Sequence, residues 1–423
     1  MIRDVAATTA GQTQPPAHWR RRIGDRAALL GPAFVAAIAY VDPGNVAANL
    51  QAGSRYGYLL VWVLVVAIAA AGIVQFLSAK LGLATGKSLP DLVGERLGRK
   101  SRLAYWVQAE GVAMATDLAE VIGGAIALYL LFDLPLLLGG VISGVVSLFL
   151  LSVQNRRGQR TFERVITGFL LIIAIGFMAG LFVAPPSAAD VAAGLVPRFD
   201  GLDSVLLAAA MLGATVMPHA VYLHSALTRD RFGKIEPGVL RRRLISATRT
   251  DVVLAMLLAG AVNISMLLLA ASGLRGLDDV DSIEGAHAAI SGILGPVVGT
   301  LFAVGLLASG LASTSVGSYA GSVIMEGLLA KRVSPFLRRS ITLIPALVLL
   351  AVGADPTTVL VISQVVLSFG LPFVLIPLMR LTSNPTLMGV DVNRTGVKIA
   401  GWVIISAIVV LNAVLIYGVV SDF

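Results

Sequence analysis

The sequence has no cysteine and little charge. None of its 423 residues is Cys, and only 13% are Asp, Glu, Lys or Arg. Without thiols the chain has no disulfides, no thiolate metal sites and no cysteine nucleophile. By contrast, 57% of the residues are hydrophobic and the mean hydropathy is +0.87, far outside the range of soluble proteins. This composition predicts many membrane spans.

Several functional motifs are also missing. The sequence lacks the His-Glu-x-x-His pattern of zinc proteases. It also lacks the Gly-x-Gly-Asp and Tyr-Asp pairs of an intramembrane aspartyl protease, and reads Tyr40-Val41-Asp42 instead. The N-terminal tail lacks a signal-peptide pattern. The net charge of +8 does not require a nucleic-acid partner, because the basic residues cluster in loops, as the positive-inside rule predicts.

Eleven apolar segments are long enough to cross a bilayer, which takes about 20 residues each. With the N-terminus inside, only Arg55, Arg198 and Arg275 of the 32 basic residues would face outward. This asymmetry favours a cytoplasmic N-terminus. The segments are residues 29–52, 57–80, 103–131, 134–153, 163–184, 204–227, 246–272, 293–329, 340–353, 357–381 and 396–420.

The first and sixth segments each contain a proline beside a residue that can bind a cation. In the first, Asp42-Pro43-Gly44-Asn45 places a carboxylate in an apolar run, at a cost of about 2.5–3.5 kcal/mol if it is unpaired. Pro43 and Gly44 should break the helix and free carbonyl oxygens, which inside a membrane must line a cavity or be buried in protein. In the sixth, Met217 precedes Pro218. One proline alone would be compatible with an ordinary kink, but matched breaks in two halves indicate a transporter's midplane site.

These breaks predict the architecture. We expect an all-α membrane protein with 11 transmembrane helices, built as a 5+5 inverted repeat with helices 1 and 6 broken. The expected parts are a tail at 1–28, a first repeat at 29–184, a second repeat at 204–381 and an additional helix at 396–420.

The chemistry of the expected site favours soft divalent ions. Asp42 offers carboxylate oxygen and Asn45 amide oxygen, and Ala39 and Ala214 precede the breaks and could offer free carbonyls. A set of oxygens alone would suit Mg²⁺ or Ca²⁺, whereas the thioether of Met217 shifts the preference toward Mn²⁺ and Fe²⁺.

The third segment carries three carboxylates, Glu110, Asp117 and Glu120, which are unlikely to face lipid. Asp117 and Glu120 lie on one helix face. They could form structural bridges to Arg338 or Arg339, or a path for protons; we favour the proton path for the pair. His219 could relay protons or donate hydrogen bonds to carbonyls at the break, and the two interpretations stay open. In the eighth segment, Gly317-x-x-x-Gly321 predicts close helix packing.

Taken together, Asp42-Pro43-Gly44-Asn45 and Met217-Pro218-His219 resemble the NRAMP family of proton-coupled divalent-metal transporters, in particular its bacterial manganese importers. The likeness extends to residues 51–57 and 115–120 and covers nearly the whole chain. It implies a leucine-transporter-like fold in the bacterial plasma membrane. The metal ligands that it implies are Asp42, Asn45, Met217, the carbonyls of Ala39 and Ala214, and in some states Gln364. Asp117 and Glu120 would belong to the proton route, with Asp117 paired to Arg339.

The sequence therefore predicts a secondary transporter, not an enzyme, that imports Mn²⁺, and also Fe²⁺ and similar ions, together with H⁺. The ions are substrates, and we expect no resident cofactor. Its partners would be the metal ion, protons and the lipid bilayer, with no nucleic acid and no obligate protein partner. The alternatives are a carrier of the same fold for Mg²⁺ or for amino acids with Na⁺ and, less favoured, an intramembrane aspartyl enzyme.

Overall fold

The computed structural model describes residues 31–157, 159–277, 280–330 and 334–421. Across these residues the chain folds entirely into helices and connecting turns, with no strand. In the described part of the chain, eight helical stretches are long and apolar enough to cross a membrane, with the broken stretch Gly201–Phe232 counted as one, which makes this a multi-pass membrane protein. The predicted tail at 1–28 lies outside the described residues. The total of 11 spans and the division into two repeats stay predictions.

The helix breaks occur in both predicted segments. The first segment consists of α2 (Pro32–Ile38), the 3-10 turn η2 (Ala39–Val41) and α3 (Pro43–Tyr56), and Asp42 has extended backbone between η2 and α3. The sixth consists of α10 (Gly201–Thr215) and α11 (Pro218–Phe232), with Val216 and Met217 outside both helices. Pro43 and Pro218 each occupy the first position of a helix, where the missing N–H costs no hydrogen bond.

The remaining long helices occupy the other predicted segments, mostly with a few more residues at one or both ends. This difference reflects polar helix ends that hydropathy does not detect. They are α4 (Val61–Thr85), α6 (Arg99–Phe132), α7 (Leu136–Arg157), α8 (Gln159–Val183), α12 (Val239–Gly273), α14 (Pro296–Leu329), α15 (Pro335–Ala351), α16 (Pro356–Thr382) and α18 (Thr395–Ser421).

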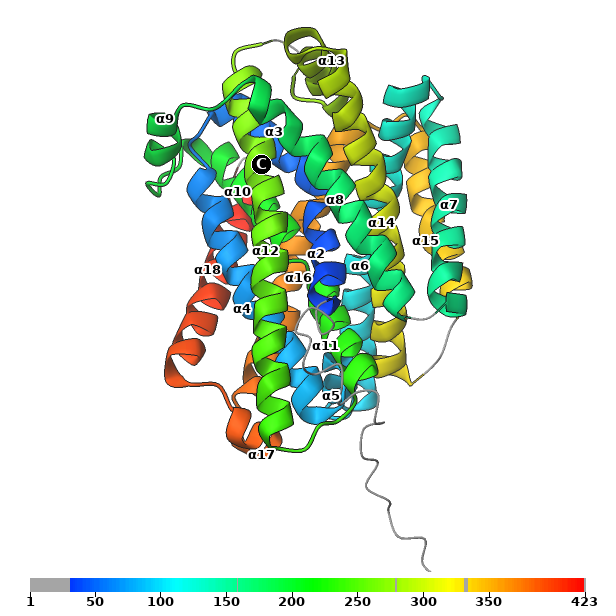
Figure 1. Ribbon diagram of the computed structural model, residues 1–423, viewed down its shortest axis with the longest axis vertical. Helices are drawn as coiled ribbons and strands as arrows, with labels where there is room; N and C mark the ends of the chain where they lie inside the picture. Colours follow the sequence, from blue (N-terminus) through cyan, green and yellow to red (C-terminus); the bar gives the residue numbers. More distant parts are fainter. Residues whose placement is uncertain (1–30, 158, 278–279, 331–333, 422–423) are drawn as a thin grey trace, which may run out of the picture.

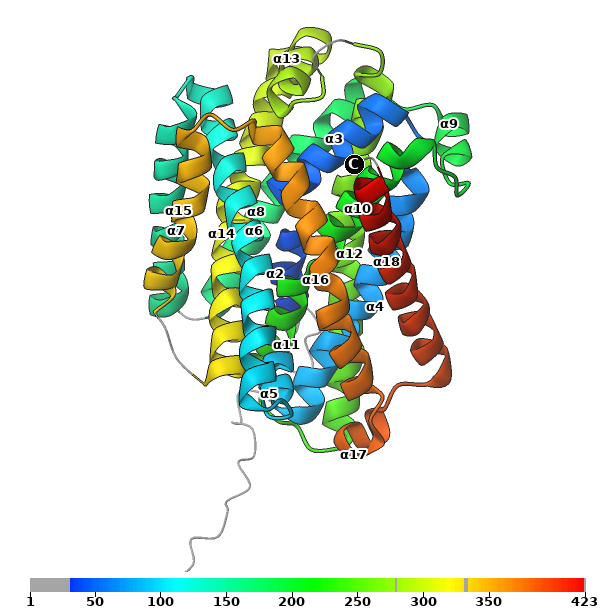
Figure 2. The same cartoon turned by 180° about the vertical axis from the view of Figure 1, so that it is seen from behind.

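The short broken helices lie at the centre of the bundle (Figures 1 and 2). In both views α2 and α11 are surrounded by longer helices, α7 and α15 run together at one edge, and α18 lies at the opposite edge. The short helices α9 (Ala188–Ala193) and α13 (Ile283–Leu294) lie at one end of the bundle. At the other end lie α5 (Leu89–Gly94) and α17 (Pro385–Met388). The breaks are therefore enclosed by protein.

Two predicted boundaries are wrong. The segment expected at 293–329 is divided at Gly295, whose φ of 94° favours glycine, so α13 ends before α14 begins at Pro296. The segment expected at 340–353 is the helix α15, which begins at Pro335. The predicted segment began after Arg338 and Arg339, because it follows the apolar run, yet both side chains are buried in the fold.

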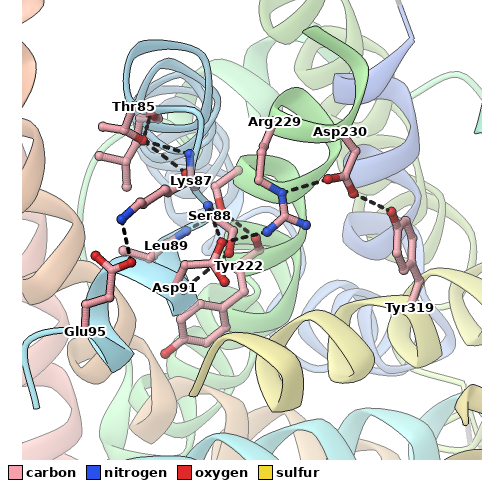
Figure 3. Close-up of polar contacts among 12 residues, drawn as sticks. Thr85, Lys87, Ser88, Leu89, Asp91, Glu95, Tyr222, Arg229, Asp230 and Tyr319 are labelled. Carbon is pink, nitrogen blue, oxygen red and sulfur yellow. Dashed lines mark hydrogen bonds and ion pairs between the residues drawn. The ribbon is translucent and has the colours of Figure 1, made fainter. Parts of the chain in front are cut away.

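A polar cluster joins α5 to the end of α11 (Figure 3). Arg229 donates to Asp91 at 2.6 Å and to Asp230 at 2.7 Å, and Asp230 accepts from Tyr319 of α14 at 3.0 Å. Asp91 also accepts from the backbone N–H of Ser88 at 2.9 Å, at the start of α5. This cluster fixes α5 against both α11 and α14.

Close helix contact at the bundle centre depends on missing side chains. A Cβ at Gly82 of α4 would collide with the backbone carbonyl of Ser225 of α11. Gly72 lies earlier on the same helix. There the nearest heavy atom to an added Cβ would be Met256 Cγ at 3.8 Å, which is an ordinary van der Waals contact. A Cβ can therefore be added at Gly72 without a clash, but not at Gly82.

We expect Gly82→Ala to lower the free energy of unfolding by about 1–3 kcal/mol, because backbone cannot move aside as a side chain can. The matched control is Gly72→Ala, which should leave stability unchanged or slightly raise it. Thermal unfolding of both variants in detergent measures the difference. Equal midpoints would contradict the proposed close contact.

Candidate metal site

The two helix breaks meet at Asn45. Its side-chain Nδ2 donates to Asp42 Oδ1 at 2.9 Å and to the carbonyl oxygen of Ala214 at 3.0 Å. Asp42 and Ala214 lie on different broken helices, and both are buried. The Asp42 carboxylate also accepts from the backbone N–H of Asn45 at 2.8 Å, as the N-cap of α3. The fold thus brings together three of the residues predicted to bind metal.

Oxygen atoms without partners surround this contact. Among the described residues, Asp42 Oδ2, Asn45 Oδ1 and Gln364 Oε1 are buried and accept no hydrogen bond. Gln364 lies on α16 with its side chain against Gly44, where any Cβ would overlap it. Buried polar atoms are nearly always hydrogen-bonded, so three orphaned oxygens in one region point to a missing cationic partner.

Met217 and Ala39 occupy the ends of the broken helices. Met217 is fully buried and caps α11 with extended backbone, φ −72° and ψ 124°. Ala39 begins the 3-10 turn η2. Of the carbonyls that follow it, that of Tyr40 accepts from Asn263 Nδ2 and that of Val41 from Ser309 Oγ, both at 2.5 Å. Two carbonyls freed by the break are therefore satisfied by α12 and α14.

Sequence reasoning missed two polar residues near the first break. Ser309 was not singled out, because one serine in a Ser/Thr-rich helix carries no signal. Gln75 of α4 donates to the Tyr40 hydroxyl, and its carbonyl oxygen lies 2.7 Å from His224 Nδ1. The signal that could have identified Gln75 is the presence of a glutamine in the middle of an apolar span.

The donor set is not that of an ordinary protein metal site. Among the described residues, no three His, Asp or Glu side chains lie close enough together to hold an ion. A cation at the breaks would therefore be bound by one carboxylate, amide and backbone oxygens, and sulfur if Met217 takes part. Such a set lacks the several carboxylates that Ca²⁺ sites normally use.

A second polar cluster connects α6 to α15. Arg339 Nη1 lies 3.0 Å from Asp117 Oδ1, and Arg338 contacts Glu110 at 2.9 Å and Asp117 at 3.6 Å. Asp117 and both arginines are at most 3% exposed, whereas the Glu110 side chain is 13% exposed. The structural bridges considered from the sequence are therefore present.

Glu120 lies beside this cluster without an ion pair. Neither of its carboxylate oxygens has a hydrogen-bond partner among the described residues, and the side chain is fully buried. A Cβ on Gly317 would lie 3.0 Å from Glu120 Oε1, and Gly321 faces the guanidinium of Arg338. The Gly317 and Gly321 pair, predicted to serve helix packing, thus makes room for charged side chains.

His219 is separate from these carboxylates. It follows Pro218 in the first turn of α11, and its Nδ1 lies 3.3 Å from Thr116 Oγ1 of α6. Its Nε2 has no hydrogen-bond partner in the described part of the chain. A contact to Thr116, one residue before Asp117, places the imidazole between the second break and the α6 cluster.

The natural resistance-associated macrophage protein-like (Nramp) family model matches residues 33–418. The chain belongs to the Nramp family. It is 62% identical over 393 residues to the divalent metal cation transporter MntH of Mycobacterium tuberculosis H37Rv, covering 93% of this chain and 92% of the relative. It also resembles the crystal structure of the Eremococcus coleocola manganese transporter, with a TM-score of 0.83 and 30% identity, over 99% of this chain and 91% of that one.

The Nramp fold is shared more widely. The nucleobase-cation-symport-1 transporter MHP1 matches with a TM-score of 0.59 over 93% of each chain, at 16% identity. At this identity the likeness concerns the fold alone. Together with the broken helices, it confirms the predicted all-helical, leucine-transporter-like architecture. Membership of a transporter family also removes the intramembrane aspartyl enzyme from consideration.

The buried pair Asp117–Arg339 yields a stability prediction. Arg339→Met should lower the free energy of unfolding by about 3–5 kcal/mol, because it leaves a buried carboxylate with only the more distant Arg338. The double variant Asp117→Leu, Arg339→Met should recover most of that loss, since no charge stays unpaired. Chemical unfolding in detergent measures both. A double variant no more stable than the single one would contradict the pairing.

Proposed function

We propose that this protein is a secondary active transporter that carries Mn²⁺, and also Fe²⁺ and similar divalent metals, into the cell together with protons. The main support is the contact of Asn45 with both helix breaks, surrounded by oxygen atoms that lack partners. The names of its relatives, a divalent metal cation transporter and a manganese transporter, agree with this function.

In this proposal the amide group of Asn45 marks the position of the ion. Its partially positive Nδ2 bridges Asp42 Oδ1 and the Ala214 carbonyl, and a divalent cation would bind the same two oxygens more strongly. Rotation of the amide would then present Asn45 Oδ1 to the ion. The proposed ligands are Asp42, Asn45, Met217, the carbonyls of Ala39 and Ala214, and Gln364.

The proton path is proposed to run through α6. A carboxylate must be ionised to bind metal, so protons and the metal ion compete for Asp42. Glu120 is the candidate acceptor, since it is buried and has no ion pair among the described residues, and Asp117 lies three residues before it on α6. Arg339 would pair with Asp117 on this path, and His219 would connect the break to α6 through Thr116.

Transport requires the site to open to each side in turn. We infer that the broken helices supply this motion, because a short helix can tilt without moving its partner half. One contact would have to break for α2 to move. Asp251 of α12 accepts from the backbone N–H groups of Gly31 and Ala33 at 3.0 and 2.9 Å and so caps α2. The proposed location is the plasma membrane, with the N-terminus in the cytoplasm.

The thioether provides a test of ion selectivity. We expect Met217→Ala to weaken Mn²⁺ binding by about tenfold or less and to increase binding of Ca²⁺ and Mg²⁺, because removal of sulfur removes the preference for soft ions. Isothermal titration of purified protein with each ion measures the change. The control Asp42→Ala should lose binding of all three. Unchanged discrimination in Met217→Ala would contradict sulfur ligation.

Proton coupling has a separate test in proteoliposomes. Mn²⁺ uptake by the natural protein should acidify the lumen and accelerate when the outside is acidic. Glu120→Gln should retain Mn²⁺ binding but lose the acidification, because an amide cannot carry the proton. Asp42→Ala should lose both fluxes. Mn²⁺ uptake without acidification in the natural protein would contradict coupling.

A further inference from the structure

A groove of about 710 Å³ opens between α4, α12 and the start of α18, apart from the metal site. Its walls include Ile73 and Phe76 of α4 and Met256 and Leu257 of α12. It ends at the loop around Asp391, next to α17, at the same end of the bundle as α5 (Figures 1 and 2). Under the proposed orientation this is the cytoplasmic end.

The two ends of the groove differ in chemistry. Lys80, Arg249 and Arg394 line the end near the loop, and apolar side chains from Ile68 to Phe76 line the rest. Asp391 also lines the basic end, but it pairs with Arg241 at 2.6 Å. The basic end therefore carries a positive excess.

Two of these cations are free to bind a ligand. Arg249 and Arg394 are exposed, and neither has an ion-pair partner among the described residues. Lys80 is instead held in place, because its ammonium donates to the Asp391 carbonyl at 3.0 Å and to Asn393 Oδ1 at 2.5 Å. The lysine thus fixes the loop, and the two arginines line the groove with their side chains exposed.

The length of the groove matches one lipid leaflet. Ile68 and Lys80 are 12 residues apart on α4, or about 18 Å at 1.5 Å per residue. Half of the bilayer's hydrocarbon core is about 15 Å thick. Gly72 lies between these ends, where an added Cβ would be 3.8 Å from Met256, so the missing side chain widens the groove.

We propose that this groove binds one anionic phospholipid, with its phosphate at Arg249 and Arg394 and an acyl chain along α4 beside Gly72. Basic groups at the cytoplasmic end of an apolar groove are suited to anionic headgroups. Such a lipid would link α4 and α12 to the loop before α18, and the proposed transport function is not needed for it to bind.

The proposal is tested by native mass spectrometry of the full-length protein in detergent. The measurement compares the binding of dioleoyl phosphatidylglycerol with that of dioleoyl phosphatidylcholine. We expect one phosphatidylglycerol to bind at least about tenfold more tightly than phosphatidylcholine. The double variant Arg249→Gln, Arg394→Gln should weaken its binding by roughly 25-fold, or about fivefold per arginine. The matched control Arg242→Gln, Arg243→Gln removes two exposed arginines of α12 outside the groove and should bind as the natural protein does.

Substitutions of Gly72 test the binding of the acyl chain. Gly72→Leu should fill the groove and weaken binding of both lipids about tenfold, whereas Gly72→Ala should have little effect. If Gly72→Leu does not fold, the arginine variants decide the result. Equal affinity for the two lipids, or full binding after loss of both arginines, would overturn the proposal. Displacement of the lipid by an equal concentration of glycerol 3-phosphate would also overturn it, because it would indicate a phosphate site without an acyl chain.

Discussion

The Asp42 carboxylate, buried at a helix break, is the constraint on which this protein's core depends. No described residue places a countercharge within hydrogen-bonding distance of it, so local dipoles must stabilise it. The backbone and side chain of Asn45 both donate to Oδ1, and the same amide reaches the second break at Ala214. Removing a charge from water is expensive unless such partners are present. Three buried oxygens nearby have no hydrogen-bond partner among the described residues and could accept further contacts.

The surrounding helices supply hydrogen-bond partners for the groups that the helix breaks expose. Asn263 and Ser309 donate to carbonyls of η2, Asp251 caps α2, and Gln75 connects Tyr40 to His224. These partners lie on α4, α12 and α14, which enclose the broken helices in Figures 1 and 2. The unwound backbone is thus tolerated because long, regular helices supply its hydrogen bonds. The result is a frame of long, regular helices around a few residues whose backbone lies outside any α-helix.

Charge has two distinct roles in this fold. In the α6–α15 cluster, arginines and carboxylates pair in the interior, where glycines of α14 leave space for them. At the end of the bundle that holds α5 and α17, Arg229 joins α5 to α11, and Arg249 and Arg394 line a groove and have no ion-pair partner within the described part of the chain. The arginines of this interior cluster are paired because water cannot reach them, whereas cations at the edge of the protein are open to ions and lipid headgroups.

By itself the sequence determined the helical membrane class, the positions of both breaks and the family, because apolar runs and the Asp42-Pro43 and Met217-Pro218 motifs are local signals. Local signals also gave the approximate helix ends, with an error at α15, where the polar residues Arg338 and Arg339 belong to the helix and are buried. Tertiary structure alone decided that Asn45 touches Ala214 and that Gly317 faces Glu120. These contacts join residues far apart in the chain, and only the packing of whole helices sets which faces meet.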